Sequence, residues 1–204
     1  PAWRMLPGNV GYVDLEQLAP ADAGSALDEL MAAKAIIVDL RGPPQGTGWG
    51  IGARLAKTDQ PFAVARFRRA AYQGPPRNEG ANTNWLSLGD VQRPTPEKRY
   101  DGRVFALIDE RTASQAEHTA LILRAGANAT FVGTTTNGTI GDVTNVVLPG
   151  GLLLRFTGHD VRHPDGRQLQ RIGLKPDVPV TQTLRSLRAK RDDVLEKALD
   201  LARR

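Results

Sequence analysis

The chain contains no cysteine and few aromatic residues. The lack of cysteine in its 204 residues excludes disulfide bonds, cysteine-based zinc sites and a cysteine nucleophile. Aromatic residues make up 5% of the sequence, which leaves few platforms on which nucleic-acid bases could stack. No apolar run approaches the roughly 20 residues that a membrane-spanning helix needs, so we predict no stable insertion into a membrane. The three histidines are scattered along the sequence, and we predict neither a metal site nor a cofactor.

The residues that are present suit one α/β domain, which we predict to span residues 1–204. Hydrophobic residues make up 40% and charged residues 24% of the chain, and the formal net charge is +5. The basic residues are spread along the whole sequence, apart from two clusters at 66–69 and 185–191. The second cluster is interleaved with leucine at helical spacing, as in the solvated face of a helix. We therefore predict no nucleic-acid partner.

Apolar runs and helical spacings alternate along the chain. A continuous apolar run at 35–40 follows a segment of helical spacing at 21–35, which predicts a strand in a sheet that is buried on both faces. The next loop, at 41–46, contains Pro43 and Pro44, and no helix can continue through it. Further strands are predicted at 8–15, 62–67, 103–108, 130–133, 143–148, 152–156 and 178–180, and further helices at 114–127 and from about residue 183 to the end.

Residues 58–100 depart from this alternation. A strand-like pattern at 62–67 is followed by a polar stretch that contains Gly74, Pro75 and Pro76. We predict an irregular β excursion with a surface hairpin, which is a place suited to substrate contacts.

The segment at 108–118 has the order strand, turn, serine, helix. A hydroxyl at a helix N-terminus lies among unpaired backbone N–H groups at the positive end of the helix dipole. Because the same geometry stabilises an oxyanion, hydrolases often place a nucleophile there, and Ser114 is a candidate. A purely structural role is the alternative, since Ser114 and Glu117 form the pattern of a capping box. Thr112 and Gln115 form the same pattern slightly earlier, and a cap at Thr112 would leave the Ser114 hydroxyl free.

Several motifs in collinear order resemble one family over nearly the whole chain. Residues 112–117 read Thr-Ala-Ser-Gln-Ala-Glu and are similar to a T-A-S-x-S-E segment, while residues 36–42 end in a D-L-R-G signature. The other motifs lie at 11–15, 131–138, 164–178 and 191–199. On these residues the chain is identified as similar to the tail-specific, or C-terminal processing, serine peptidases.

The resemblance implies a ClpP/crotonase-like α/β core of repeated ββα units, with the irregular β excursion added to it. It implies a serine endopeptidase that hydrolyses unfolded or C-terminally exposed polypeptides through an acyl-enzyme at Ser114. It also implies a location outside the cytoplasm, in the periplasm or cell envelope, and it is compatible with a homo-oligomer. The family usually carries a PDZ domain ahead of this core. No PDZ domain is visible in this sequence, so we expect the chain to be the protease core of a longer protein.

The resemblance also suggests where an oxyanion would be held. One backbone donor would be the N–H of Gln115, the residue after the nucleophile. The other would come from the loop at 42–46, where the prolines have no N–H. Gly42, Gln45 or Gly46 must then donate.

The general base departs from the family pattern. The family uses a Lys in a G-K-G segment, and the matching position here is Thr139, whose hydroxyl cannot accept the serine proton near neutral pH. Candidate replacements are His118, one helical turn after the serine, and His163, with His159 as a third. Glu117 is a candidate orienting group. The related tricorn protease pairs its serine with His and Glu, and a base from a preceding part of the protein is a further alternative.

Two functions from different classes follow. The first is the serine endopeptidase, with polypeptide as its substrate. The second is a catalytically inactive module with a protease fold that binds a peptide or an apolar small ligand, which the missing Lys favours. We favour the enzyme, because Ser114, its helix signals and the glycine-rich loop are retained.

Overall fold

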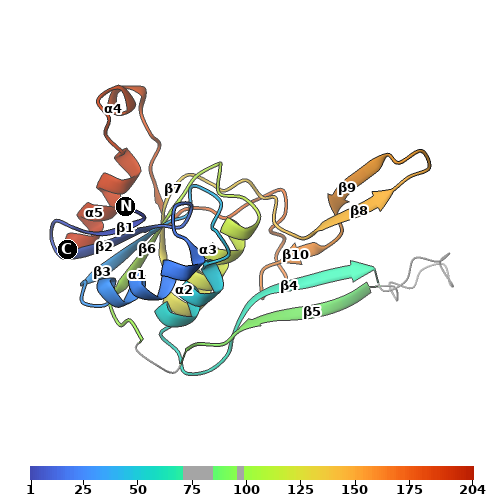
Figure 1. Ribbon diagram of the computed structural model, residues 1–204, viewed down its shortest axis with the longest axis horizontal. Coiled ribbons are helices and arrows are strands. Elements are labelled where there is room, and N and C mark those ends of the chain that lie inside the picture. Colours follow the sequence, from blue (N-terminus) through green and yellow to red (C-terminus); the bar gives the residue numbers. More distant parts are fainter. Residues whose placement is uncertain (71–84, 96–98) are drawn as a thin grey trace.

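The central element of the computed structural model is a six-stranded sheet (Figure 1). The structure describes residues 1–70, 85–95 and 99–204. The strands, in spatial order, are β1 (Trp3–Leu6), β2 (Val10–Asp14), β3 (Ala35–Asp39), β6 (Arg103–Ile108), β7 (Thr130–Gly133) and β11 (Val178–Pro179). Strand β1 is antiparallel to β2, and the other neighbours are parallel. The mixed α/β fold predicted from the sequence is confirmed.

The parallel register brings three connections together at one edge of the sheet. Asp39 pairs with Leu107, and Ile108 pairs with Gly133, so β3, β6 and β7 end side by side. The loop after β3, the turn before Ser114 and the segment after β7 therefore all start from this edge. Ligand sites of open α/β sheets form at such carboxyl ends.

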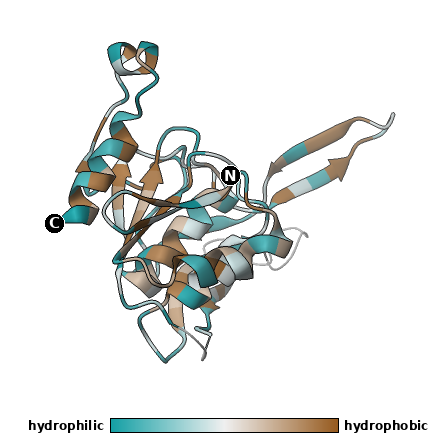
Figure 2. Ribbon diagram, turned by 60° about the vertical axis from the view of Figure 1, so that its left-hand side comes forward, coloured by the Kyte–Doolittle hydropathy of each residue, from teal (hydrophilic) through white to brown (hydrophobic). Residues whose placement is uncertain are grey.

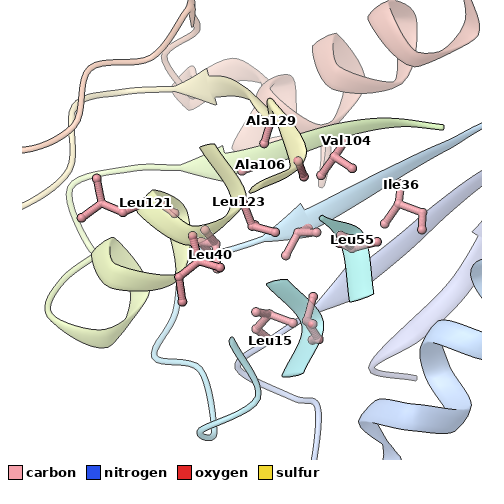
Figure 3. Close-up of a cluster of buried hydrophobic side chains, with 14 of the residues drawn as sticks. Leu15, Ile36, Leu40, Leu55, Val104, Ala106, Leu121, Leu123 and Ala129 are labelled. Atoms are coloured by element: carbon pink, nitrogen blue, oxygen red, sulfur yellow. The ribbon is translucent and has the colours of Figure 1, made fainter. Parts of the chain in front are cut away.

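Both faces of the sheet are covered, as the continuous apolar strands predict. On one face lie α1 (Ala23–Leu30), α2 (Gly48–Leu55) and α3 (Gln115–Ala127). The other face packs against α5 (Asp193–Arg203). Figure 3 shows the first core, in which strand residues such as Ile36 and Val104 lie among leucines of the helices. This packing fixes α3, the helix that begins next to Ser114.

Helix α2 was not predicted, because glycine at 48, 50 and 52 lowers helix propensity. Two of these glycines permit a close approach to α3. A Cβ at Gly52 would lie 2.2 Å from Ile122 Cγ2, and one at Gly48 would lie 2.1 Å from Thr119 Oγ1. The tertiary contact thus outweighs the propensity, and it places Trp49 of α2 beside the start of α3.

The single C-terminal helix predicted from residue 183 is wrong. The chain forms α4 (Leu184–Arg188) and α5, and the two are separated at Lys190, whose φ is 55°. Asp192 begins α5 as its N-cap, because its Oδ1 accepts the Leu195 N–H at 2.9 Å. Burial opposes the charge on Asp192, but the bonds from Arg41 and from Leu195 outweigh it and lower the pKa of this carboxyl.

Two hairpins extend from the body on the same side of Figure 1. The predicted excursion contains β4 (Phe62–Ala70) and β5 (Trp85–Gln92), which pair with each other, and β10 (Asp160–Arg162) pairs with β4. Its tip, with Gly74, Pro75 and Pro76, lies outside the described residues. The second hairpin is β8 (Val143–Val147) with β9 (Leu153–Thr157), as predicted. Among the described residues, none of the helices has the length and hydropathy of a membrane span.

Candidate active site

Ser114 has a backbone conformation that serine rarely adopts. Its φ is 51° and its ψ is −113°, and it is the N-cap residue of α3. A non-glycine residue at positive φ stores on the order of 1–3 kcal/mol of strain and persists only where its surroundings enforce it. Sharp, strained turns from a strand to a helix are a known way to expose a serine nucleophile. The Ser114 residue is exposed.

Thr112 enforces this turn and does not cap the helix. Its side chain is fully buried. Its Oγ1 donates to the carbonyl of Leu40 at 2.9 Å and accepts the Asp109 N–H at 3.0 Å. The alternative in which Thr112 begins the helix is therefore wrong. Thr112 ties the turn to the loop after β3.

Ser114 and Glu117 form a capping box. The Ser114 N–H donates to Glu117 Oε2 at 3.2 Å. The Ser114 side-chain oxygen faces the Glu117 N–H, which completes the box. An oxygen that only accepts in the cap keeps its O–H proton for transfer to a base.

The carboxylate of Glu117 is fully buried and joins the serine turn to the segment after β7. Its Oε1 accepts the Thr136 hydroxyl at 2.5 Å and the Gly138 N–H at 2.7 Å. Its Oε2 accepts the Thr139 N–H at 3.0 Å in addition to that of Ser114. Within the described part of the chain it makes no hydrogen bond to a histidine. Glu117 therefore positions residues 136–139 beside Ser114.

A cavity of about 200 Å³ opens beside Ser114. Its walls include Trp49, Phe67 and Ile140, so they are largely apolar. The ring centroid of His118 lies 5.4 Å from that of Trp49 and 6.4 Å from that of Phe67. The cavity can hold an apolar side chain next to the serine hydroxyl.

His118 shares this cavity with Ser114 and is held by a carboxylate. Its Nε2 lies 2.6 Å from Asp90 Oδ2 of β5. Because a carboxylate only accepts hydrogen bonds, Nε2 carries a proton, and in the neutral ring Nδ1 then has a free lone pair. Among the described residues, no hydrogen bond joins His118 to the Ser114 hydroxyl.

The other two histidines lie elsewhere. His163 lines a separate cavity with Leu121 and Phe131, and burial, assisted by Arg167, lowers its pKa. His159 lies with Thr139 in a neighbouring cavity. Its Nδ1 is 3.2 Å from Asp142 Oδ2, and its ring centroid is 6.1 Å from that of Phe67. Neither of them lines the cavity that contains Ser114.

The candidate oxyanion donors lie in different surroundings. Within the described residues, the Gln115 N–H has no acceptor at the start of α3. Gly46, at φ 77°, is exposed two residues before Gly48, which packs on α3. Gly42 is buried against Glu16 and lines a different cavity. Gly46 therefore stays a candidate donor, whereas Gly42 lines a cavity that does not contain Ser114.

The charged residues of the D-L-R-G motif have a structural role. The Arg41 guanidinium lies between Asp39, at 2.6 Å, and Asp192, at 2.7 Å. The Tyr12 hydroxyl donates to Asp39 Oδ2 at 2.8 Å, and burial together with Asp39 raises the pKa of Tyr12. This network joins β2, the loop after β3 and α5, and it does not line the Ser114 cavity.

Comparison with known proteins identifies the family of this chain. Residues 9–180 match the profile described as "Peptidase family S41". The chain belongs to peptidase family S41.

Similar proteins support the same fold for this S41 chain. The structure of a candidate peptidase from Parabacteroides merdae superimposes with a TM-score of 0.80 and 18% identity, over 98% of this chain and 63% of that one. Mature CPAF in complex with lactacystin gives a TM-score of 0.74 and 18% identity, over 95% and 51%. The photosystem II D1 C-terminal processing protease gives 0.62 and 20%, over 87% and 45%.

A Chlamydia pneumoniae protein, CPj1016/CpB1054, is 33% identical over 108 residues, which are 51% of this chain and 17% of that protein. This S41 chain thus spans about half to two thirds of the solved structures named above, and less of the curated relative.

In this S41 chain, Thr139 lies next to the serine. The N–H groups of Ser114 and Thr139 donate to the same oxygen of Glu117, so the two nitrogens are at most about 6 Å apart. The backbone of position 139, where the sequence resemblance predicts a Lys, is therefore close to that of Ser114, and its side chain carries a hydroxyl.

Three residues of the candidate site were not predicted from the sequence. Trp49, Phe67 and Asp90 come from α2, β4 and β5, and they meet at His118 only in the folded chain. An unexplained tryptophan in a glycine-rich segment was the available signal for Trp49. The sequence holds no such signal for Asp90, whose partner is 28 residues away.

Proposed function

We propose that this S41 chain is a serine endopeptidase of the tail-specific type with Ser114 as its nucleophile. The observation that carries the proposal is the strained, exposed Ser114 at the N-terminus of α3, beside an apolar cavity. Ser114 Oγ attacks the peptide carbonyl and transfers its proton to a base. The C–N bond then breaks, the amine leaves with that proton, and water hydrolyses the acyl-enzyme.

Backbone donors and the helix dipole hold the oxyanion in this proposal. The Gln115 N–H supplies one donor, and the Gly46 N–H supplies the other. The positive end of α3 adds to the stabilisation of the developing charge. We keep Gly42 out of this role because it faces another cavity.

We assign the base to His118, with Asp90 as its orienting partner. His118 lines the Ser114 cavity, whereas His163 and His159 line other cavities. Because Nε2 donates to Asp90, the lone pair that would accept the serine proton is the one on Nδ1. A contact between a base and its nucleophile that is absent without substrate often forms once substrate is bound. Glu117 acts through the 136–139 segment and not through the base.

The cavity predicts an apolar side chain next to the scissile bond. Its walls are Trp49, Phe67 and Ile140, and Asp142 lies at its rim with a side chain that is 82% exposed. Unfolded peptides with Leu at this site should have a kcat/KM about 10²-fold above matched peptides with Asp, because Asp would be desolvated and repelled. Quenched-fluorescence peptides that differ only at this residue measure the ratio.

Two variants serve as controls for this experiment. Ser114→Ala should remove all cleavage, and His118→Ala should lower it by roughly 10²–10⁴-fold. Equal rates for the Leu and Asp peptides would contradict the cavity assignment. A rate that survives His118→Ala would assign the base to another group.

Position 139 offers a gain-of-function test. Thr139→Lys should bring an amine within reach of Ser114 and raise peptide hydrolysis more than about tenfold at pH 9–10, where a growing fraction of an exposed lysine is neutral. Thr139→Met has similar length without the amine and is the matched control. Equal pH profiles for the two variants would show that position 139 does not reach the nucleophile.

The inactive binding module is favoured by one observation, the hydroxyl at Thr139 in place of an amine. That protein would keep the cavity and bind apolar ligands without any cleavage by the wild-type chain. Binding without hydrolysis in the peptide experiment would support it.

A further inference from the structure

The β8–β9 hairpin is continuous with the Ser114 cavity. Gly141 and Asp142 line that cavity, and β8 starts at the next residue, Val143. The hairpin then extends away from the body (Figure 1). The hairpin thus begins directly at the wall of the Ser114 cavity.

One face of the hairpin is apolar along its length. In the register, Val146 lies opposite Leu154 and Thr144 opposite Phe156, and Leu148 with Leu152 closes the same face. The apolar side chains of this face are exposed by 37–66%. On the opposite face the pair Asn145 and Arg155 interrupts the apolar residues. The colouring of Figure 2 shows the apolar character of both strands.

The hairpin also offers unpaired backbone. In the part of the chain that the structure describes, β8 and β9 form a sheet of two strands, so each has one free edge. An isolated two-stranded hairpin is marginal in water, and free apolar edges are templates for a further strand. Arg155 is the one charged residue within 143–157. The expected occupant is therefore an extended, apolar polypeptide.

We propose that this face and edge of the β8–β9 hairpin bind an extended apolar segment of the polypeptide substrate while a neighbouring segment occupies the cavity at Ser114. The proposal rests on the proposed peptidase function. Main-chain pairing gives affinity without sequence specificity, and the apolar face selects unfolded segments that expose hydrophobic residues. Five strand residues span roughly 17 Å, so a peptide that fills only the cavity cannot pair along the length of β8.

Binding to the Ser114→Ala chain tests this without any need for catalysis. The probe is fluorescein-labelled lactalbumin, unfolded by reduction and carboxymethylation, and the readout is fluorescence anisotropy. Replacing Val146, Leu154 and Phe156 by threonine keeps strand propensity, and we expect it to raise the Kd at least about tenfold. The matched control replaces Val143, Val147 and Leu153 of the opposite face by threonine and should change the Kd less than about threefold.

A second measurement does not depend on any substitution. Hydrogen exchange of the Ser114→Ala chain should show protection of amides within 143–157 when the unfolded probe is bound. Absence of this protection, or equal Kd values for both triple variants and the parent, would overturn the proposal. A dimer in sedimentation velocity that the first triple variant dissociates, with an unchanged Kd, would assign the face to a second copy and overturn it too.

The outcomes separate this proposal from the peptidase function. If the chain binds the probe through the hairpin but cleaves no peptide, the binding surface is supported and the peptidase function is contradicted. A chain that cleaves short apolar peptides, but whose Kd for the unfolded probe does not change in the hairpin variants, would keep the peptidase function and remove the hairpin proposal.

Discussion

Replacement of Ser114 by glycine is expected to abolish peptide hydrolysis and to stabilise the protein at the same time. The hydroxyl is the proposed nucleophile, and its loss should lower the rate by roughly 10³-fold or more. Glycine adopts the Ser114 conformation, at φ 51°, without the strain of a Cβ, while its own entropy offsets part of the gain. A net gain of about 1 kcal/mol would raise the Tm by roughly 2–4 °C, measured by calorimetry.

Ser114→Ala is the matched control for this prediction. Alanine removes the hydroxyl but keeps the Cβ, so it should abolish hydrolysis without the gain in Tm. A glycine variant that melts below the wild type would contradict the account of strain at this turn.

Replacement of Glu117 by alanine is expected to destabilise the fold by about 3–5 kcal/mol. The buried carboxylate accepts hydrogen bonds from Thr136, Gly138, Thr139 and Ser114, and its loss leaves these donors without their acceptor. The segment at 136–139 would then detach from the serine turn. Urea denaturation followed by circular dichroism measures the loss.

Glu110 provides the control within the same region. It is exposed, and its carboxylate accepts the Thr134 hydroxyl at 3.1 Å. Glu110→Ala should change the free energy of unfolding by no more than about 0.5 kcal/mol. Similar losses for the two variants would contradict the role given to Glu117.

Local patterns predicted most of the sheet and less of the helices. The strand at 35–40 was predictable because all of its side chains are apolar up to Asp39, and both of its faces are buried. Helix α2 was not, because the reason for glycine at 48 and 52 is contact with α3, which no local window contains. The break between α4 and α5 at Lys190 was not predictable for a similar reason, because Asp192 is held in place by Arg41, which is distant in sequence.

The candidate site also contains residues that local patterns predict and residues that they do not. Ser114 was predictable as a candidate nucleophile because a short local motif surrounds it, and the choice between Ser114 and Thr112 as the cap needed the structure. The importance of Glu117 to residues 136–139 depends on contacts 19 to 22 residues apart. The Asp90 partner of His118 depends on how the β4–β5 hairpin folds back onto α3.

Covalent labelling with a fluorophosphonate probe shows whether Ser114 is an activated nucleophile. Trypsin should release Ser114 in the peptide 112–124, because Arg111 and Arg124 flank it. We expect one adduct, on Ser114, that Ser114→Ala removes and that His118→Ala slows. No adduct at any pH between about 6 and 10, or an adduct that persists in Ser114→Ala, would contradict an activated nucleophile at Ser114.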